Sequence, residues 1–179
     1  MAERRVRGAL VRGGANVPDR TLQPAGFSKI WDTDGFYDPG QRQVLTIPTS
    51  RRSGRYQIRV AVRWMNPWHQ LGDPVPPLDE LFQSYYYSCV TVNGDLVGNQ
   101  ARATAAAVPA ATGTTQYYDV DANLRKKDKV GVNLWQSFGT EVMAGVHLEI
   151  RRLGPVVPEV TDHALPSPVS ESAPIDFDW

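Results

Sequence analysis

Apolar and polar residues alternate through the middle of the chain, and this alternation predicts β-strands. The clearest case is the segment RYQIRVAVRW, whose apolar members fall on one face: Tyr56, Ile58, Val60, Val62 and Trp64. Side chains of a strand point to opposite faces in turn, so a period of two over this length indicates a half-buried strand. Each apolar side chain buried there contributes about 1.5–3 kcal/mol to folding.

Further strands are predicted between turn signals. QVLTIPT ends at Pro48, and YYYSCVTVNGDLV contains Asn93-Gly94, which is the strongest short hairpin signal. Two more strands are predicted on either side of the polar corner 125–128, in TQYYDVDANL and KVGVNLWQ. The last predicted strand is VMAGVHLEI. Only the alanine-rich ARATAAAVPAAT suggests one or two helical turns, which Pro109 stops. Short strands at this spacing predict an all-β fold, a two-sheet antiparallel jelly-roll sandwich.

The aspartates of WDTDGFYDPG suit either a calcium loop or a turn between strands. A loop of the EF-hand type that starts at Asp32 would place Phe36, Tyr37 and Gln43 where a ligand, a glycine and a glutamate are required. The alternative fits better, because the segment 38–40 reads Asp-Pro-Gly. That order is typical of a type II turn in which Gly40 takes a positive φ. We therefore predict a turn here.

The ends of the chain differ from its middle in charge and in proline content. We expect a basic N-terminal arm over 1–25, the jelly-roll domain over 26–153, and an acidic, proline-rich C-terminal arm over 154–179. In the last segment Ile175, Phe177 and Trp179 alternate with acidic residues. This pattern suits a strand that docks on a sheet edge or groove, and it equally suits a solvated tail.

The composition excludes several classes of protein. Lys plus Arg and Asp plus Glu both number 19, so no overall basic field points to nucleic acid. No apolar run approaches the length of a membrane helix, and the first residues lack the apolar region of a signal peptide. The single cysteine cannot form an intrachain disulfide. These features predict a protein made in the cytoplasm, with neither membrane nor nucleic acid as its partner.

No group of residues supports catalysis or a cofactor. Cys89 lies inside a predicted strand, where a buried structural thiol is expected more often than a nucleophile. His69, His147 and His163 are far apart in a loop, a strand and a tail, without metal-ligand spacing. No phosphate-binding glycine motif is present. We therefore expect a protein that is not an enzyme and binds no cofactor or metal.

The proline-rich stretch 65–84 is a long loop and a candidate for ligand binding. It places Trp68 and His69 close to Trp64 at the end of a strand. A tryptophan beside polar groups suits stacking on a sugar ring, which defines the alternative function of a carbohydrate- or receptor-binding module, with a host surface glycan as its ligand. The simpler interpretation is that Trp64 is core and Trp68 packs the loop onto the sheet.

The order of these motifs resembles the jelly-roll family of complement C1q and tumour necrosis factor. FYDPG…QVLTIPTSRRSGRYQIRVAVRW is similar to the opening of that domain, VTVNGDLV to its strand before an Asn-Gly turn, and ANLRKKDKVGVNLWQ and VHLEIRRL to its last strands. The resemblance covers roughly 26–153 and implies a compact homotrimer. No collagen-like repeat or signal peptide accompanies it. The length and charged arms look like those of phage structural proteins. We therefore expect a virion component, a minor tail protein or a capsid decoration, attached to other virion proteins by its arms.

The resemblance also implies that one sheet face mediates trimer formation. If the segments 55–64, 129–136 and 146–150 share a sheet, their outward positions bring charges of both signs next to a tryptophan. A self-complementary face of this kind could pair Arg63 with Glu149 and bury Trp135 around a three-fold axis. The predicted trimer-interface residues are Arg63, Asn133, Trp135, His147 and Glu149.

Overall fold

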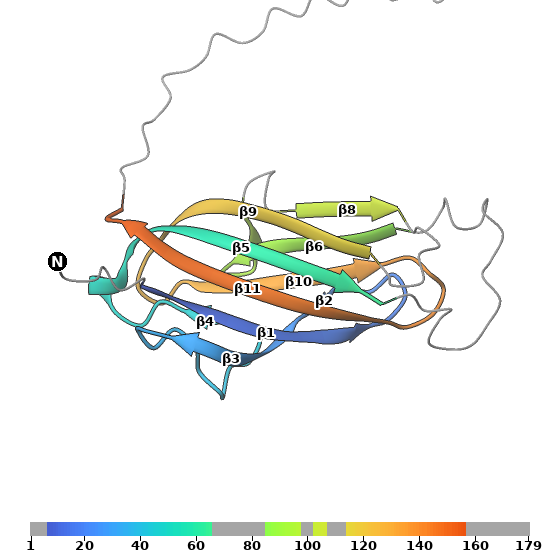
Figure 1. Cartoon of the computed structure of the whole chain (residues 1–179), viewed down its shortest axis with the longest axis horizontal. Coiled ribbons are helices and arrows are strands. Elements are labelled where there is room, and N and C mark those ends of the chain that lie inside the picture. The colour runs from blue at the N-terminus through green and yellow to red at the C-terminus, as the bar shows by residue number, and fades with distance from the viewer. Residues whose placement is uncertain (1–6, 66–84, 98–101, 107–113, 157–179) are drawn as a thin grey trace, which may run out of the picture.

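The chain folds into two antiparallel sheets packed face to face (Figure 1). The computed structural model describes residues 7–65, 85–97, 102–106 and 114–156. Sheet A has the order β3 (Gly26–Asp32), β1 (Gly8–Val17), β11 (Val142–Gly154), β5 (Gly54–Trp64), β9 (Thr114–Leu124). Sheet B has the order β2 (Gln23–Pro24), β10 (Lys129–Gln136), β6 (Tyr85–Val92), β7 (Asp95–Leu96). In addition, β4 (Leu45–Thr46) pairs with β10, and β8 (Arg102–Ala106) pairs with β6.

This strand order is that of a jelly roll, because sequence neighbours repeatedly lie in different sheets. The chain leaves sheet A after β5, enters sheet B at β6, returns at β9, crosses again at β10 and ends in β11. The single helical element of the described residues is the 3-10 turn η1 (Ser50–Arg52). The predicted all-β, two-sheet jelly roll is thereby confirmed.

The core forms where the apolar faces of the two sheets meet. All five apolar residues of β5 that the alternation assigned to one face are at most 3% exposed. Trp64 of sheet A stacks on Tyr86 of sheet B with 4.7 Å between ring centroids, and Tyr86 stacks on Phe138 at 4.4 Å. The prediction that β5 is half-buried is therefore confirmed, and its last residue joins the two sheets through an aromatic stack.

The aspartate-rich segment between β3 and β4 forms turns. The Asp32 carboxylate accepts hydrogen bonds from the backbone N–H groups of Asp34 (3.1 Å), Gly35 (2.8 Å) and Tyr37 (2.9 Å). The predicted turn at 38–40 is present, because the N–H of Gln41 donates to the carbonyl of Asp38 at 2.9 Å. The predicted type II geometry is wrong, since Gly40 does not have a positive φ.

The hairpin predicted at Asn93-Gly94 has the expected conformation. Asn93 has a φ of 57° and Gly94 a φ of 92°, and Val92 pairs with Asp95 across the turn. Two consecutive residues with positive φ define the turn whose twist matches a two-residue hairpin. The Asn93 side chain also accepts a hydrogen bond from the N–H of Lys129, which fastens the hairpin to β10.

Two expectations about strand assignment are wrong. The predicted arm 1–25 contains β1, an inner strand of sheet A between β3 and β11, and β2 of sheet B. The reason is steric: a Cβ on Gly13 would lie 1.8 Å from the carbonyl oxygen of Gly26, so glycine lets β1 and β3 approach. Within the alanine-rich segment, the helical turn is replaced by strand β8, which pairs with β6.

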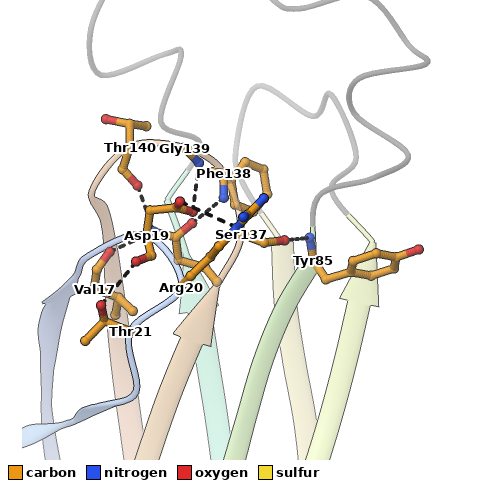
Figure 2. Close-up of polar contacts among 10 residues, drawn as sticks. Val17, Asp19, Arg20, Thr21, Tyr85, Ser137, Phe138, Gly139 and Thr140 are labelled. Carbon is orange, nitrogen blue, oxygen red and sulfur yellow. Dashed lines mark hydrogen bonds and ion pairs between the residues drawn. The ribbon is translucent and has the colours of Figure 1, made fainter.

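A buried glutamine fixes one end of the sandwich through hydrogen bonds to Val17, Phe138 and Thr140, which Figure 2 labels. Gln136 is fully buried, and its amide nitrogen donates to the carbonyls of Val17 (2.9 Å) and Thr140 (2.7 Å). Its side-chain oxygen accepts the N–H of Phe138 at 2.6 Å. Every hydrogen-bonding group of this buried amide therefore has a partner, and the connection between β10 and β11 is held against β1.

Candidate assembly face on sheet A

The outer face of sheet A carries a continuous pattern of charged, small and aromatic side chains. The strand register places Arg12, His147, Ala61 and Tyr117 in one line across four strands. The neighbouring line consists of Gly14, Gly145, Arg63 and Thr115. These positions alternate with the buried residues of the same strands, so their side chains point away from the core.

A hollow of about 760 Å³ lies over these two lines. It exists because Ala61 and Gly145 are small, whereas the residues around them are long. The residues that line it are Arg12, Gly13, Ser28, Ala61, Arg63, Thr115, Tyr117, Gly145, Val146 and His147. A Cβ on Gly145 would meet nothing closer than 3.9 Å, so the hollow is open space above the sheet.

Charge is divided across this face. Arg12 and Arg63 line the hollow, and no Asp or Glu of the described chain does so. The edge strand β9 instead presents Asp119 and Asp121, which interact with Gln57 (3.1 Å) and Arg55 (2.5 Å) of the neighbouring strand. The face is thus basic at the hollow, and its β9 edge carries in Asp119 a carboxylate whose hydrogen-bond partner is neutral.

Tyr117 stands between these two regions with 77% of its surface exposed. A large aromatic side chain in this position offers apolar area to a partner at a low cost in conformational entropy. It is the most exposed of the large hydrophobic residues in the described part of the chain. Of the site residues, Tyr117 therefore has the most apolar surface to gain from burial by a partner.

The structure brings three of the five predicted interface residues together and separates the other two. Arg63, His147 and Glu149 lie on the outer face of sheet A. Asn133 and Trp135 lie on β10, which belongs to sheet B, so the expectation that 129–136 shares a sheet with the other two segments is wrong. Alternation along a strand fixes which residues share its faces, but it does not determine which sheet the strand joins.

Glu149 already has partners within its own chain. Its carboxylate lies 2.6 Å from Nε of Arg151 and 4.0 Å from a guanidinium nitrogen of Arg59, and only 14% of its side chain is exposed. A contact between Arg63 and Glu149 of two copies would therefore compete with these internal pairs. The sequence analysis did not predict Arg12, Tyr117 and Gly145 as site residues. Each occupies an outward-facing position of its strand, on β1, β9 and β11, and the alternation along these strands could have indicated this.

Several predicted sites lie elsewhere. Cys89 is a buried free thiol on β6, and burial raises its pKa, so the thiolate is disfavoured. The loop residues Trp68 and His69, and the tail residues Ile175, Phe177 and Trp179, lie outside the described residues.

In the part of the chain that the structure describes, no three His, Cys, Asp or Glu side chains gather as a metal site. Over those same residues, no helix has the length and hydropathy that crossing a bilayer requires.

The fold and this face define a two-sheet jelly roll. No protein-family model and no curated protein matches the sequence. Among solved structures, the chain is similar to the globular domain of zebrafish complement 1qA, with 11% identity, a TM-score of 0.44, and coverage of 79% of this chain and 94% of that one. It is also similar to Eiger TNF from S. frugiperda, with 10% identity, a TM-score of 0.49, and coverage of 88% and 98%. Both of these proteins have jelly-roll folds.

Proposed function

We propose that this chain is a non-enzymatic structural protein whose jelly roll assembles as a homotrimer through the outer face of sheet A. The observation that carries the proposal is the division of this face into a basic hollow and an acidic edge. In a closed ring, Asp119 of one copy, whose hydrogen-bond partner within its own chain is the neutral Gln57, approaches Arg12 and Arg63 of the next. Tyr117 is then covered at the junction.

The experiment fills the hollow without disturbing the isolated subunit. Gly145→Gln adds a long side chain where a Cβ has ordinary room, so the monomer folds normally and the contact is blocked. Gly154→Gln is the matched control, because nothing lies within 4 Å of a Cβ at that position. Light scattering after size exclusion is expected to give three times 19.9 kDa for the parent and the control, and 19.9 kDa for Gly145→Gln. A parent protein that elutes as a single chain contradicts the proposal.

We further propose that the trimer is part of a phage virion, as a minor tail protein or a capsid decoration. The support is the resemblance of the domain to a family with phage structural members, together with the acidic segment 154–179, whose alternating Ile175, Phe177 and Trp179 suit docking on another virion protein. Deletion of 157–179 is expected to leave the trimer intact and to reduce incorporation into particles. Normal incorporation of the shortened chain would contradict attachment by this segment.

A further inference from the structure

One end of the sandwich carries a dense group of basic residues. Figure 1 places the start of β1, the start of β5 and the end of β11 at this end. The corner between β9 and β10 joins it, because the N–H of Lys126 donates to Oγ of Ser53 at 3.0 Å and the N–H of Lys127 to the carbonyl of Ile47 at 2.8 Å. We call this surface the basic end; its exposed cations are Arg7, Arg51, Arg125, Lys126 and Lys127.

The carboxylates at the basic end are already paired with other groups. Asp34 lies 2.7 Å from Arg52, and Asp121 lies 2.5 Å from Arg55. Asp128 accepts the backbone N–H of Arg125 at 2.6 Å and the side-chain amide of Asn93 at 2.9 Å. Within the described residues, none of the five cations that define the basic end forms an ion pair. This surface therefore has positive charge available for an acidic partner.

The charge that would neutralise this excess is present in the same chain. Of the 19 acidic residues, five lie in 157–179, namely Glu159, Asp162, Glu171, Asp176 and Asp178, and this segment has no Lys or Arg. Residues 1–156 consequently carry a net charge of about +5, and the final segment about −5, which together give the net charge of zero. The neutrality of the chain thus results from two regions of opposite sign.

The acidic segment begins beside the basic end. The N–H of Arg55 donates to the carbonyl of Pro155 at 3.3 Å, and Gly154 pairs with Arg55 at the start of β5. On its other side Arg55 pairs with Asn123, so two strand spacings, roughly 10 Å, separate Gly154 from the end of β9. An extended chain advances about 3.3 Å per residue, so Glu159 and Asp162 reach Lys126 and Lys127 without any change in the fold.

We propose that the acidic segment 157–179 binds the basic end of its own chain, with Glu159 and Asp162 against Lys126 and Lys127. Tethering keeps these carboxylates at a high effective concentration, so a few ion pairs on a wet surface are enough to populate the contact. The contact is distinct from the trimer face, because it uses the end of the sandwich rather than the hollow. It covers the cations of the basic end while the segment is not engaged by another partner.

Zero-length carbodiimide cross-linking of the full chain at low salt tests the contact directly. Amide bonds are expected between Lys126 or Lys127 and Glu159 or Asp162, whereas Lys29 on β3 is expected to give none. A mixture of nitrogen-15-labelled and unlabelled protein distinguishes links within one chain from links between copies. Links only between differently labelled copies, or links spread equally to Lys29, would overturn the proposal.

Amine acetylation followed by mass spectrometry supplies a second measurement on the full chain. The double variant Glu159→Gln, Asp162→Asn is expected to raise the acetylation rates of Lys126 and Lys127 roughly fivefold at low salt, the scale of a few exposed ion pairs. The control Glu141→Gln removes an exposed carboxylate just before β11, at the other end of the sandwich, and is expected to change neither rate. About 1 M salt should erase the difference. Unchanged rates in the double variant would overturn the proposal, and light scattering on the same samples reports separately on the trimer.

Discussion

The indole Nε1 of Trp64 donates a hydrogen bond to Oε1 of Gln116 over 2.8 Å inside the sandwich. Ser88 Oγ donates to the same oxygen at 2.8 Å, and the Gln116 amide nitrogen donates to the carbonyl of Tyr86 at 3.3 Å. Gln116 is 5% exposed, so these bonds form away from water. One side chain of β9 thus connects β5 of its own sheet with β6 of the other, and it satisfies the polar atom of the largest core residue.

Replacing Gln116 by leucine is expected to destabilise the fold by about 2–4 kcal/mol, because it leaves the Trp64 indole and the Ser88 hydroxyl buried without an acceptor. The measurement is urea unfolding followed by tryptophan fluorescence, on protein whose oligomeric state is held constant. Ser88→Ala is the control: it removes one donor while Oε1 of Gln116 still accepts the Trp64 indole, and it should cost about 1 kcal/mol. Equal costs for both variants would show that the shared acceptor has no special role.

Asp32 is expected to be a structural carboxylate and not a calcium ligand. Both of its oxygens accept backbone N–H groups of the following turn. Asp32→Ala should therefore lower stability by about 2–4 kcal/mol, because three donors lose a charged acceptor. Thermal unfolding checks this change, with exposed Asp38→Ala as the control.

The same geometry predicts that millimolar calcium leaves the midpoint of thermal unfolding unchanged. A site that bound calcium in the folded state alone would raise the midpoint, and the rise would grow with the logarithm of the calcium concentration above the dissociation constant. A rise that disappears in Asp32→Ala would contradict the turn interpretation and restore the calcium loop.

Much of the fold was predictable from the sequence, because the strongest strands alternate large apolar with polar residues. The sequences of β5 and β11 predict strands in this way, and Asn93-Gly94 predicts the hairpin between β6 and β7. β1 was missed although its sequence also alternates: Ala9, Val11 and Val17 are buried. The inward residues of β1 are small, and Gly13-Gly14 interrupts their alternation. The arginines of this segment are therefore its clearest feature, and they indicate a charged arm and not a strand.

The candidate site was less predictable, for a topological reason. The alternation along β10 places Trp135 on the predicted face of the strand. However, β10 pairs with β6 in sheet B, and the sequence of β10 alone does not predict which sheet the strand joins. The hollow depends on Arg12, Ala61, Gly145 and Tyr117, which come from four strands and meet only through their register. Sequence patterns specify faces, whereas long-range pairing determines which faces combine.

Tyr117 is expected to contribute to assembly without contributing to the stability of the single chain. Because it is 77% exposed, Tyr117→Ser removes little buried area from the monomer. If neighbouring copies cover it, the variant should raise the dissociation constant of the trimer at least tenfold, the effect of losing about 1.4 kcal/mol. Sedimentation over a concentration series measures this shift.

Tyr85→Ser is the matched control for that experiment, since Tyr85 is 44% exposed and lies on sheet B. It should leave the dissociation constant unchanged. A larger effect of Tyr85 than of Tyr117 would assign the contact to sheet B and would bring Trp135 and Asn133 back as interface residues.

Alkaline pH is expected to unfold the protein through its buried tyrosines. Burial raises the pKa of Tyr56 to about 12 against the weaker opposing charge of Arg152, and burial also raises the pKa of Tyr86 and of Tyr118. In the unfolded chain these hydroxyls ionise near the ordinary value of about 10. Above that pH the unfolded chain releases protons that the folded chain retains, so the free energy of unfolding falls. The full stability is present below about pH 10 and is lost as the pH rises through the raised values.

Tyrosinate absorbance and tryptophan fluorescence, recorded on one sample during an alkaline titration, measure this effect. The late-ionising tyrosines should titrate together with the loss of the fold, as one cooperative step. Tyr86→Phe keeps the stacks on Trp64 and Phe138 but removes one ionisable group, so its unfolding midpoint should move to higher pH. Tyr117→Phe, at an exposed position, should leave the midpoint in place. If all tyrosines ionised before fluorescence changed, ionisation would not drive unfolding, and the packing around Tyr86 would admit the phenolate.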